Sequence, residues 1–394
     1  MKKLSLIGLA LLLLLSGCAP KYDSQDTNVK KTDDDKEKAI IPKYQISENY
    51  YRTILPFEAS KARGQTVSNL NSRYDVNEME MGLMRIAQQK FSPDDYVYKE
   101  GQFLSAKTVN KWLQRKYTKE QFAEKMKKDK ELEESDNLGL NPIDPGKGDI
   151  VKRNEDNPLY LAHILEQDYM VKKSDDKVGL AGVVIGLALN SVHYYQKEQY
   201  GDVFEVKIPE DKMIEEGKKI ADEVLERLRK KDGLKNVPIT IALYKQAEKS
   251  SVVPGNFVAY TNVGEGSNQI SSWKNVNEKY YLFPNDQTKE KYRDDHSTYI
   301  KFKEDVEKYF PNFSGVVGRG YYIDDQLQEM KIEIPIQFYG KSEAIGFTQY
   351  VTGLVMEYFP SYVSVEVTVT SVNGVESLIV RKANEKEPFV HISQ

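Results

Sequence analysis

The chain has 394 residues, of which 40% are hydrophobic and 29% are charged, and its formal net charge at pH 7 is −4. This near-neutral balance, without a basic stripe, excludes nucleic acid as an expected partner. Cys18 is the only cysteine, so residues 19–394 have no thiol for a disulfide, a zinc–thiolate site or a cysteine nucleophile.

The first 17 residues have the organisation of a secretory signal peptide. Lys2 and Lys3 supply positive charge, and about a dozen apolar residues follow, fewer than the roughly 20 that a membrane-spanning helix needs. Ser16 and Gly17 then lead directly into Cys18, an arrangement that resembles the lipobox of bacterial lipoproteins. The resemblance implies cleavage between Gly17 and Cys18 and a diacylglycerol on the Cys18 thiol. An ordinary cysteine or an uncleaved anchor would not need this order of residues.

Residues 18–44 are predicted to form a disordered tether behind the lipid. The stretch is rich in Asp and Lys and poor in apolar residues, so it cannot bury enough surface to offset the entropy of ordering. A flexible chain of this length spans on the order of 25–30 Å. We therefore expect diacylglyceryl-Cys18 to hold the protein on the extracytoplasmic face of the cell membrane. Diacylglyceryl transferase and lipoprotein signal peptidase are the expected partners during maturation.

Residues 45–156 are predicted to be mainly helical. Two patterns typical of capping boxes, at residues 75–78 and 118–121, indicate helix starts. Another helix is expected from near Ser105, with Val109 and Trp112 on its buried face.

An internal repeat dominates the remaining chain, in residues 157–264 and 301–394, with a linker over residues 265–300. The sequence thus predicts an α+β fold, with a helical N-terminal region followed by two β-β-α-β-β units built on antiparallel sheets. Each unit begins with Gly-Val-Val, and a short helix is expected ahead of it. In the first unit we expect a helix at 159–170, an apolar strand from 182, a strand at 203–208, a helix at 211–231 and strands at 238–244 and 257–263. In the second unit we expect, in the same order, a helix at 302–310, an apolar strand from 315, a strand at 330–338, a helix at 342–359 and strands at 363–372 and 375–380.

The second unit contains a clear hairpin pattern. Valines alternate with Ser364, Glu366 and Thr368, which is typical of a half-buried antiparallel strand. Asn373-Gly374 then separates this run from the next one and predicts a type I′ turn.

The histidines do not form a metal-binding pattern. None of them has the His-x3-His or His-Glu-x2-His spacing of a zinc site, so we expect no metal and no cofactor. The four are His163, His193, His296 and His391.

Two clusters of polar residues are candidate sites, but each has a simpler interpretation. Residues 294–297, Asp-Asp-His-Ser, contain the residue types of a hydrolase triad, yet neighbours in sequence do not have triad geometry. His163, Glu166 and Asp168 are expected on or near one helical face, where capping or surface packing is the favoured role. No catalytic residue is therefore assigned.

Two glycine-rich runs, residues 264–266 and 315–320, do not have the context of a phosphate site. Neither opens a helix after a buried parallel strand, which phosphate binding would require. The glycines are expected to mark bulges or close approach between strands. Arg319 lies among them and is a candidate anion-binding residue, although a solvated surface position is the favoured interpretation.

Several of these features together resemble the CamS family of sex-pheromone precursor lipoproteins from low-GC Gram-positive bacteria. They are the lipobox, the polar tether, Asn157-Pro158 followed by residues 166–169 (Glu-Gln-Asp-Tyr), and the two Gly-Val-Val units. The resemblance runs essentially from end to end. It implies that a short hydrophobic peptide cut from the signal sequence can act as a conjugation pheromone. The residues at that place are Leu11, Leu12, Leu13, Leu14, Leu15, Ser16 and Gly17, a run richer in leucine than the varied peptides of the family.

The resemblance implies no catalytic residue in the mature part. We therefore expect a binding or interaction module for a protein or small-molecule ligand, displayed on the membrane. One alternative is a solute- or peptide-binding lipoprotein, which would need two βαβ lobes and a hinge. The other is an envelope hydrolase acting on wall polymers, which would need two carboxylates about 5–10 Å apart in a deep pocket.

Overall fold

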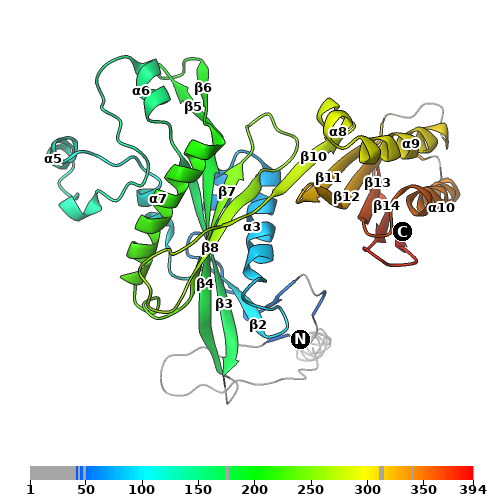
Figure 1. The fold of residues 1–394 in the computed structure, drawn as a ribbon, viewed down its shortest axis with the longest axis horizontal. Coiled ribbons are helices and arrows are strands. Elements are labelled where there is room, and N and C mark those ends of the chain that lie inside the picture. The colour runs from blue at the N-terminus through cyan, green and yellow to red at the C-terminus, as the bar shows by residue number, and fades with distance from the viewer. Residues whose placement is uncertain are drawn as a thin grey trace, which may run out of the picture.

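The computed structural model describes residues 41–42, 45–47, 50–173, 177–309, 315–338 and 340–393. The signal peptide, Cys18 and all of the expected tether except residues 41–42 lie outside the described residues. Two α/β units lie side by side, the first drawn from blue to green and the second from yellow to red (Figure 1).

Helices and strands alternate along most of the described chain. The helices are α2 (Gln65–Asn69), α3 (Arg73–Ala87), α4 (Ala106–Trp112), α5 (Lys119–Lys128), α6 (Ile150–Asp156), α7 (Glu210–Arg229), α8 (Asp286–Lys291), α9 (Arg293–Tyr309) and α10 (Lys341–Tyr358), with a 3₁₀ turn at Glu134–Asp136. The strands are β1 (Arg52–Thr53), β2 (Tyr96–Glu100), β3 (Leu161–Lys173), β4 (Lys177–Asn190), β5 (Val192–Gln196), β6 (Val203–Lys207), β7 (Ile239–Gln246), β8 (Asn256–Val263), β9 (Lys274–Asn275), β10 (Glu278–Phe283), β11 (Val317–Ile323), β12 (Gln326–Pro335), β13 (Ser364–Ser371), β14 (Gly374–Arg381) and β15 (Phe389–Ile392). No helix in these described ranges is both long and apolar enough to cross a bilayer.

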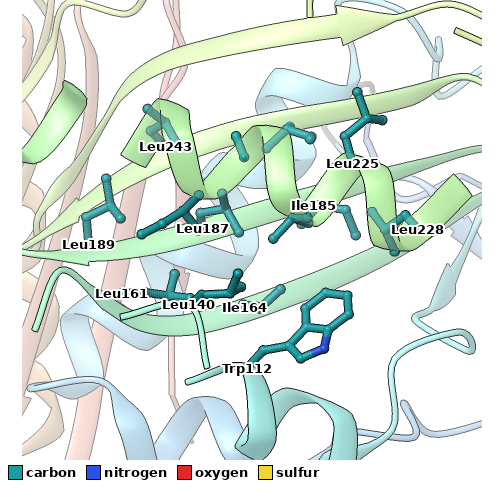
Figure 2. Packing of buried hydrophobic residues seen from close by; sticks show 14 of the residues in the cluster. Trp112, Leu140, Leu161, Ile164, Ile185, Leu187, Leu189, Leu225, Leu228 and Leu243 are labelled. Atoms are coloured by element: carbon teal, nitrogen blue, oxygen red, sulfur yellow. The ribbon is translucent and has the colours of Figure 1, made fainter. Parts of the chain in front are cut away.

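The first unit is built on a seven-stranded mixed sheet in the order β1-β2-β3-β4-β7-β8-β9. β4 and β7 run parallel and are joined by α7, whereas β3 and β8 pair antiparallel on either side of them. Ile185 and Leu187 of β4 pack in the cluster that includes α7, as Figure 2 shows. Val184 and Ala188 face the opposite cluster, which includes α3. Because helices cover both faces of the sheet, β4 is an almost continuous apolar run.

The second unit is built on a six-stranded mixed sheet in the order β10-β11-β12-β13-β14-β15. β12 and β13 run parallel and are joined by α10, and the other neighbours pair antiparallel. Helices α9 and α10 cover one face, where Val365, Val367 and Val369 are buried. The alternate side chains of β13 are only half-buried, so the other face of this sheet is partly open.

A very short connection joins the two units. β9 ends the first sheet at Asn275, and β10 begins the second sheet at Glu278. Helix α3 of the first unit lies beside the start of the second sheet (Figure 1). The short linker and this helix set the position of the two sheets relative to each other.

The prediction of a helix at residues 159–170 is wrong, because most of this segment forms strand β3. Its apolar residues are buried on both faces of the sheet, so they do not show the alternation that indicates a strand. The helix expected at 302–310 is present as part of α9, which begins earlier, at Arg293.

The expected match between the two Gly-Val-Val runs is also wrong. Residues 182–184 lie in β4, the strand that precedes the α7 crossover, whereas residues 315–317 lead into β11, one strand earlier in its unit. The strand expected at 203–208 exists as β6, but it pairs with β5 in a separate two-stranded ribbon. Both main sheets are mixed and not purely antiparallel, since the first contains the parallel pairs β1–β2 and β4–β7 and the second contains the parallel pair β12–β13.

The N-terminal region is less helical than expected, since β1 and β2 join the first sheet. Helix α3 is capped by Ser72, whose Oγ accepts the Asp75 N–H, so its start lies before the expected 75–78 box. The expected capping box at Thr118 is confirmed, with Gln121 closing it, and the helix predicted from near Ser105 is present as α4, with Ser105 as its N-cap.

The expected hairpin between β13 and β14 is present, but its turn is not of type I′. The turn residues are Val372 and Asn373, between the paired residues Ser371 and Gly374. A type I′ turn needs positive φ at both turn residues, and only Gly374, with φ of 117°, has a positive value here.

Candidate functional site

A groove of about 680 Å³ lies between α3 and the open face of the second sheet. Its walls come from segments that are far apart in the sequence, and they are unusually rich in tyrosine. The lining residues are Tyr50, Tyr74, Asn77, Glu78, Met81, Arg85, Gln88, Pro254, Tyr280, Arg319, Tyr321, Gln328, Glu329, Lys331, Tyr362, Ser364 and Ala383.

An ion-pair network joins the two units beside this groove. Arg85 Nη2 of α3 lies 2.6 Å from Glu78 Oε1 and 2.8 Å from Glu278 Oε2 of β10. The Tyr280 hydroxyl donates to Glu78 Oε2 over 2.6 Å. Burial of an unpaired charge is costly, so each member of this network depends on the others.

The charges in the network shift one another's pKa. Burial raises the pKa of Glu78, although Arg85 acts to lower it. Burial acts to lower the pKa of Arg85, but Glu78 and Glu278 outweigh burial and raise it above its ordinary value. Burial also raises the pKa of Tyr280, so that side chain remains a neutral hydrogen-bond donor. The network therefore keeps Arg85 charged near neutral pH.

Tyrosines surround the groove at two depths. Tyr280 and Tyr321 stack with ring centroids 4.8 Å apart, and the Arg85 guanidinium lies 5.0 Å from the Tyr321 centroid. At the rim the side chains are more open, with Tyr50 46% exposed, Tyr74 40% and Tyr362 46%. The rim thus presents aromatic surface that the fold itself does not cover.

Arg319 of β11 lies across the groove from α3. Its guanidinium carbon lies 4.7 Å from the centroid of the Tyr74 ring, within the range of a cation–π contact. Throughout the described residues, no ion pair joins Arg319 to a carboxylate. Its cross-strand neighbour Lys331, by contrast, has Glu329 at 3.4 Å. Arg319 is therefore the lining cation whose charge the protein leaves available.

His163 is buried and does not cluster with Glu166 and Asp168. Its Nε2 lies 3.0 Å from the Thr66 hydroxyl and its Nδ1 lies 3.2 Å from the Asn69 amide. Burial lowers the pKa of His163 to about 4. Because side chains alternate along a strand, His163 faces α2 while the two carboxylates point to the opposite side. The candidate cluster therefore does not form, and the favoured capping or surface role on a helix is also wrong, because all three residues are buried in strand β3.

Glu166 and Asp168 hold a loop against the first sheet. Glu166 accepts from the N–H groups of Phe103 and Leu104 at 2.8 and 2.6 Å, and Asp168 accepts from that of Gln102 at 3.0 Å. Burial, together with the neighbouring charge of Glu166, raises the pKa of Asp168 well above its ordinary value. Backbone amides occupy both Glu166 oxygens and Asp168 Oδ2, so the two residues form a structural clasp, while Asp168 Oδ1 is buried without a hydrogen-bond partner among the described residues.

The run at residues 294–297 does not form a triad. The Asp295 carboxylate accepts from the Tyr322 hydroxyl at 2.9 Å, and His296 Nδ1 lies 2.9 Å from the Thr288 hydroxyl.

The two remaining histidines lie apart from this run. Burial and the proximity of Arg115 lower the pKa of His193 to about 4, and its Nε2 is hydrogen-bonded to Asn154 in the first unit. His391 lies in the edge strand β15.

No group of three or more His, Cys, Asp and Glu in the described ranges is placed to hold a metal ion.

The glycine-rich runs have structural roles, but these differ from the bulges and close strand approach that were predicted. A Cβ on Gly318 would lie 2.5 Å from the Tyr299 ring, and one on Gly320 would lie 2.8 Å from the Phe283 ring, so aromatic side chains pack directly on β11. Gly266 has φ of 67° and follows β8 in a turn. These positions leave Arg319 between two glycines, on the open face of the strand.

A second hollow, of about 660 Å³, lies beside α5 in the first unit. Three of its four cations have partners: Lys125 donates to the Tyr117 hydroxyl, Arg115 donates to the carbonyl groups of Pro142 and Asn157, and Lys116 lies 3.6 Å from Glu223. It also lacks the cluster of exposed tyrosines that the first groove has. The groove between the units is therefore the stronger candidate.

Sequence reasoning identified Arg319 as a candidate but missed the rest of the groove. Tyr50, Tyr74 and Tyr362 lie in segments separated by many residues, and no spacing rule connects them. The alternation along β12 and β13 does show which side chains occupy the open face, but it does not show that α3 lies opposite.

Comparisons with known proteins identify relatives that cover most of the described region. A family model described as CamS sex pheromone cAM373 precursor matches residues 57–387. The crystal structure of a sex pheromone precursor from Lactobacillus salivarius subsp. salivarius is 35% identical with a TM-score of 0.79, covering 89% of this chain and 98% of that one. The structure of the C-terminal domain of the sex pheromone staph-cAM373 precursor from Staphylococcus aureus is 35% identical with a TM-score of 0.72, covering 83% of this chain and 98% of that one. No curated protein matches the chain.

Proposed function

The chain belongs to the CamS sex pheromone precursor family, and from this premise we propose that it is a lipoprotein precursor anchored on the extracytoplasmic face of the cell membrane. The order of basic, apolar and small residues ahead of Cys18 supports this assignment. Diacylglyceryl-Cys18 is the anchor, and cleavage before Cys18 releases the signal peptide.

The released signal peptide supplies the pheromone in this proposal. Residues 11–17 occupy the place that family membership gives to the hydrophobic peptide. Because the pheromone comes from the signal peptide alone, it does not explain what the folded part does.

We propose that the mature part is a non-catalytic binding module, and the groove between the two units is the observation that carries this proposal. Its volume falls within the roughly 300–1,000 Å³ of typical ligand sites. Exposed tyrosines and an arginine without an ionic partner among the described residues suit the capture of a ligand.

The two alternatives fit this groove less well. An envelope hydrolase needs two carboxylates free to act as acid and base, but Glu78 pairs with Arg85 and Glu329 pairs with Lys331. A two-lobed transporter-type binding protein needs a hinge, whereas the ion pair of Arg85 with Glu278 and the short β9–β10 connection join the units closely.

We also infer that the two units are copies of one motif, β3-β4-α7-β7-β8 and β11-β12-α10-β13-β14. In both, a hairpin is followed by a helical crossover to a parallel strand and then by an antiparallel strand. This assignment shifts the expected sequence match between the units by one strand.

Labelling with a radioactive fatty acid tests the anchor. Cys18→Ala is expected to abolish lipid incorporation and to leave the uncleaved precursor, while Ser24→Ala in the expected tether should incorporate label like the wild type. Incorporation that persists in Cys18→Ala would refute the assignment.

A further inference from the structure

The geometry points to an anionic saccharide as the ligand of the groove, with its carboxylate or phosphate paired to Arg319 and its sugar rings packed against the rim tyrosines. This inference rests on the proposed binding function and adds the chemical class of the ligand. Four features of the groove carry it.

The first feature is the charge of Arg319. Its guanidinium lies over Tyr74 and, throughout the described chain, has no carboxylate in ion-pair contact. A guanidinium offers five N–H donors in a planar fork that matches a carboxylate or a phosphate. The other lining cations, Arg85 and Lys331, already have carboxylate partners. An anion entering the groove therefore meets one free positive group.

The second feature is that the floor of the groove offers no free main chain. β11 pairs with β10 and β12, and β12 pairs with β11 and β13, so their backbone donors and acceptors are used within the sheet. A peptide binding by strand addition needs an open sheet edge, and this surface is a sheet face. Recognition must therefore come from side chains.

The third feature is the chemistry of those side chains. Tyr50, Tyr74 and Tyr362 are each about half exposed and come from three different segments around the hollow. The C–H face of a sugar ring is weakly apolar and packs on an aromatic face, while the tyrosine hydroxyl can bond to the sugar. Asn77 and Ser364 line the same hollow and add neutral groups that both donate and accept hydrogen bonds.

The fourth feature is size. A hollow of about 680 Å³ accommodates a ligand of a few sugar rings and is small for a folded protein partner. Its open side allows a longer chain to continue beyond the part that is bound.

Calorimetric titration of the full-length protein, purified in a detergent without sugar headgroups, tests the inference. The probes are tetragalacturonate, which carries carboxylates, glucose 6-phosphate, which carries a phosphate, and maltotetraose, which is neutral. We expect one of the two acidic probes to bind at least tenfold more tightly than maltotetraose, and the tighter one identifies the anionic group. Arg319→Gln should weaken that binding at least tenfold, and Tyr74→Leu should weaken it severalfold.

Lys301→Gln is the matched control, because Lys301 is an exposed cation on α9, which covers the opposite face of the same sheet. It should leave binding unchanged, and circular dichroism should show that all three variants are folded. Equal affinity for neutral and acidic probes, equal losses in Arg319→Gln and Lys301→Gln, or no binding of any probe would each overturn the inference. The anchor in the proposed function is decided separately, by lipid labelling of Cys18.

Discussion

Arg85 of α3 and Glu278 of β10 belong to different units and form an ion pair, with 2.8 Å between Nη2 and Oε2. Glu78 completes the network from the same helix as Arg85, and both carboxylate side chains are only 9% exposed. The contact therefore joins the two units through groups that cannot be separated without leaving a charge buried and unpaired.

Arg85→Leu is expected to destabilise the protein by about 3 kcal/mol, because both glutamates lose their partner in a desolvated position. Urea unfolding at pH 7 measures this loss. Lys230→Ala is the control, since Lys230 and Glu226 form a solvent-exposed pair whose removal should leave the free energy of unfolding nearly unchanged. Equal effects of the two variants would show that the network does not stabilise the junction.

The sequence predicted elements best where one face of an element is exposed. The alternating valines of β13 and the amphipathic helix α7 were both correctly identified, because a polar face shows the period of the element. β3 was mistaken for a helix because it is buried on both faces, and the two Gly-Val-Val runs were mismatched because local similarity does not specify strand order.

The groove could be predicted only in part for a related reason. Arg319 was recognisable from its place between two glycines, but its contact with Tyr74 depends on how the two units lie together. The Arg85 network likewise joins residues about 200 positions apart in sequence. Such contacts follow from tertiary packing and leave no periodic signal.

Asp168→Asn is expected to stabilise the protein at pH 7 by about 1 kcal/mol. The pKa of Asp168 is raised in the folded state, so between its unfolded and folded pKa values the unfolded chain releases a proton that the folded one keeps. The stability that Asp168 contributes is therefore lost as pH rises. An asparagine does not titrate, so it removes this loss, and its side-chain oxygen still accepts from the Gln102 N–H. The gain, measured by urea unfolding, should shrink towards pH 4.

Glu166→Gln is the matched control for this site and should be destabilising at both pH 7 and pH 4. Both Glu166 oxygens accept backbone N–H groups, and an amide would turn an NH₂ group towards one of them. A stabilising effect of Glu166→Gln would contradict its role as an acceptor for two backbone N–H groups. A gain in Asp168→Asn that does not depend on pH would contradict a raised pKa of Asp168.

His163 is expected to make the protein less stable as pH falls. Its pKa is lowered to about 4 in the folded state against about 6.5 in an unfolded chain, so below pH 6.5 the unfolded chain binds a proton that the folded protein does not. Between pH 7 and pH 5 this amounts to a loss of about 2 kcal/mol. Urea unfolding of His163→Gln should show a smaller fall than the wild type, and an identical fall would assign the pH dependence to other groups.

Gly318→Ala and Gly353→Ala are expected to have effects of opposite sign. A methyl group on Gly318 would lie 2.5 Å from the Tyr299 ring under β11, which should cost about 1–3 kcal/mol. Gly353 lies on the exposed side of α10 with no atom near its added Cβ, so alanine should stabilise the helix by about 0.5–1 kcal/mol. Thermal melting of both variants checks this, and destabilisation by Gly353→Ala would contradict the open surface there.

A fragment that begins at Gln45 should fold and melt cooperatively, because the buried hydrophobic residues of the first unit begin with Tyr51. Of the described residues packed against a hydrophobic cluster, it loses only Ile41, which is partly buried against Ile54 and Val97. Tyr51 packs against Tyr169 with ring centroids 4.8 Å apart, and its hydroxyl donates to the Phe91 carbonyl over 2.5 Å. A fragment beginning at Pro56 lacks Tyr51 and Ile54, both 8% exposed, and should be less stable by about 3 kcal/mol or more. Urea unfolding followed by circular dichroism compares the two fragments. Equal stability would place the start of the folded part after residue 55, and a non-cooperative transition in the longer fragment would place it before residue 45.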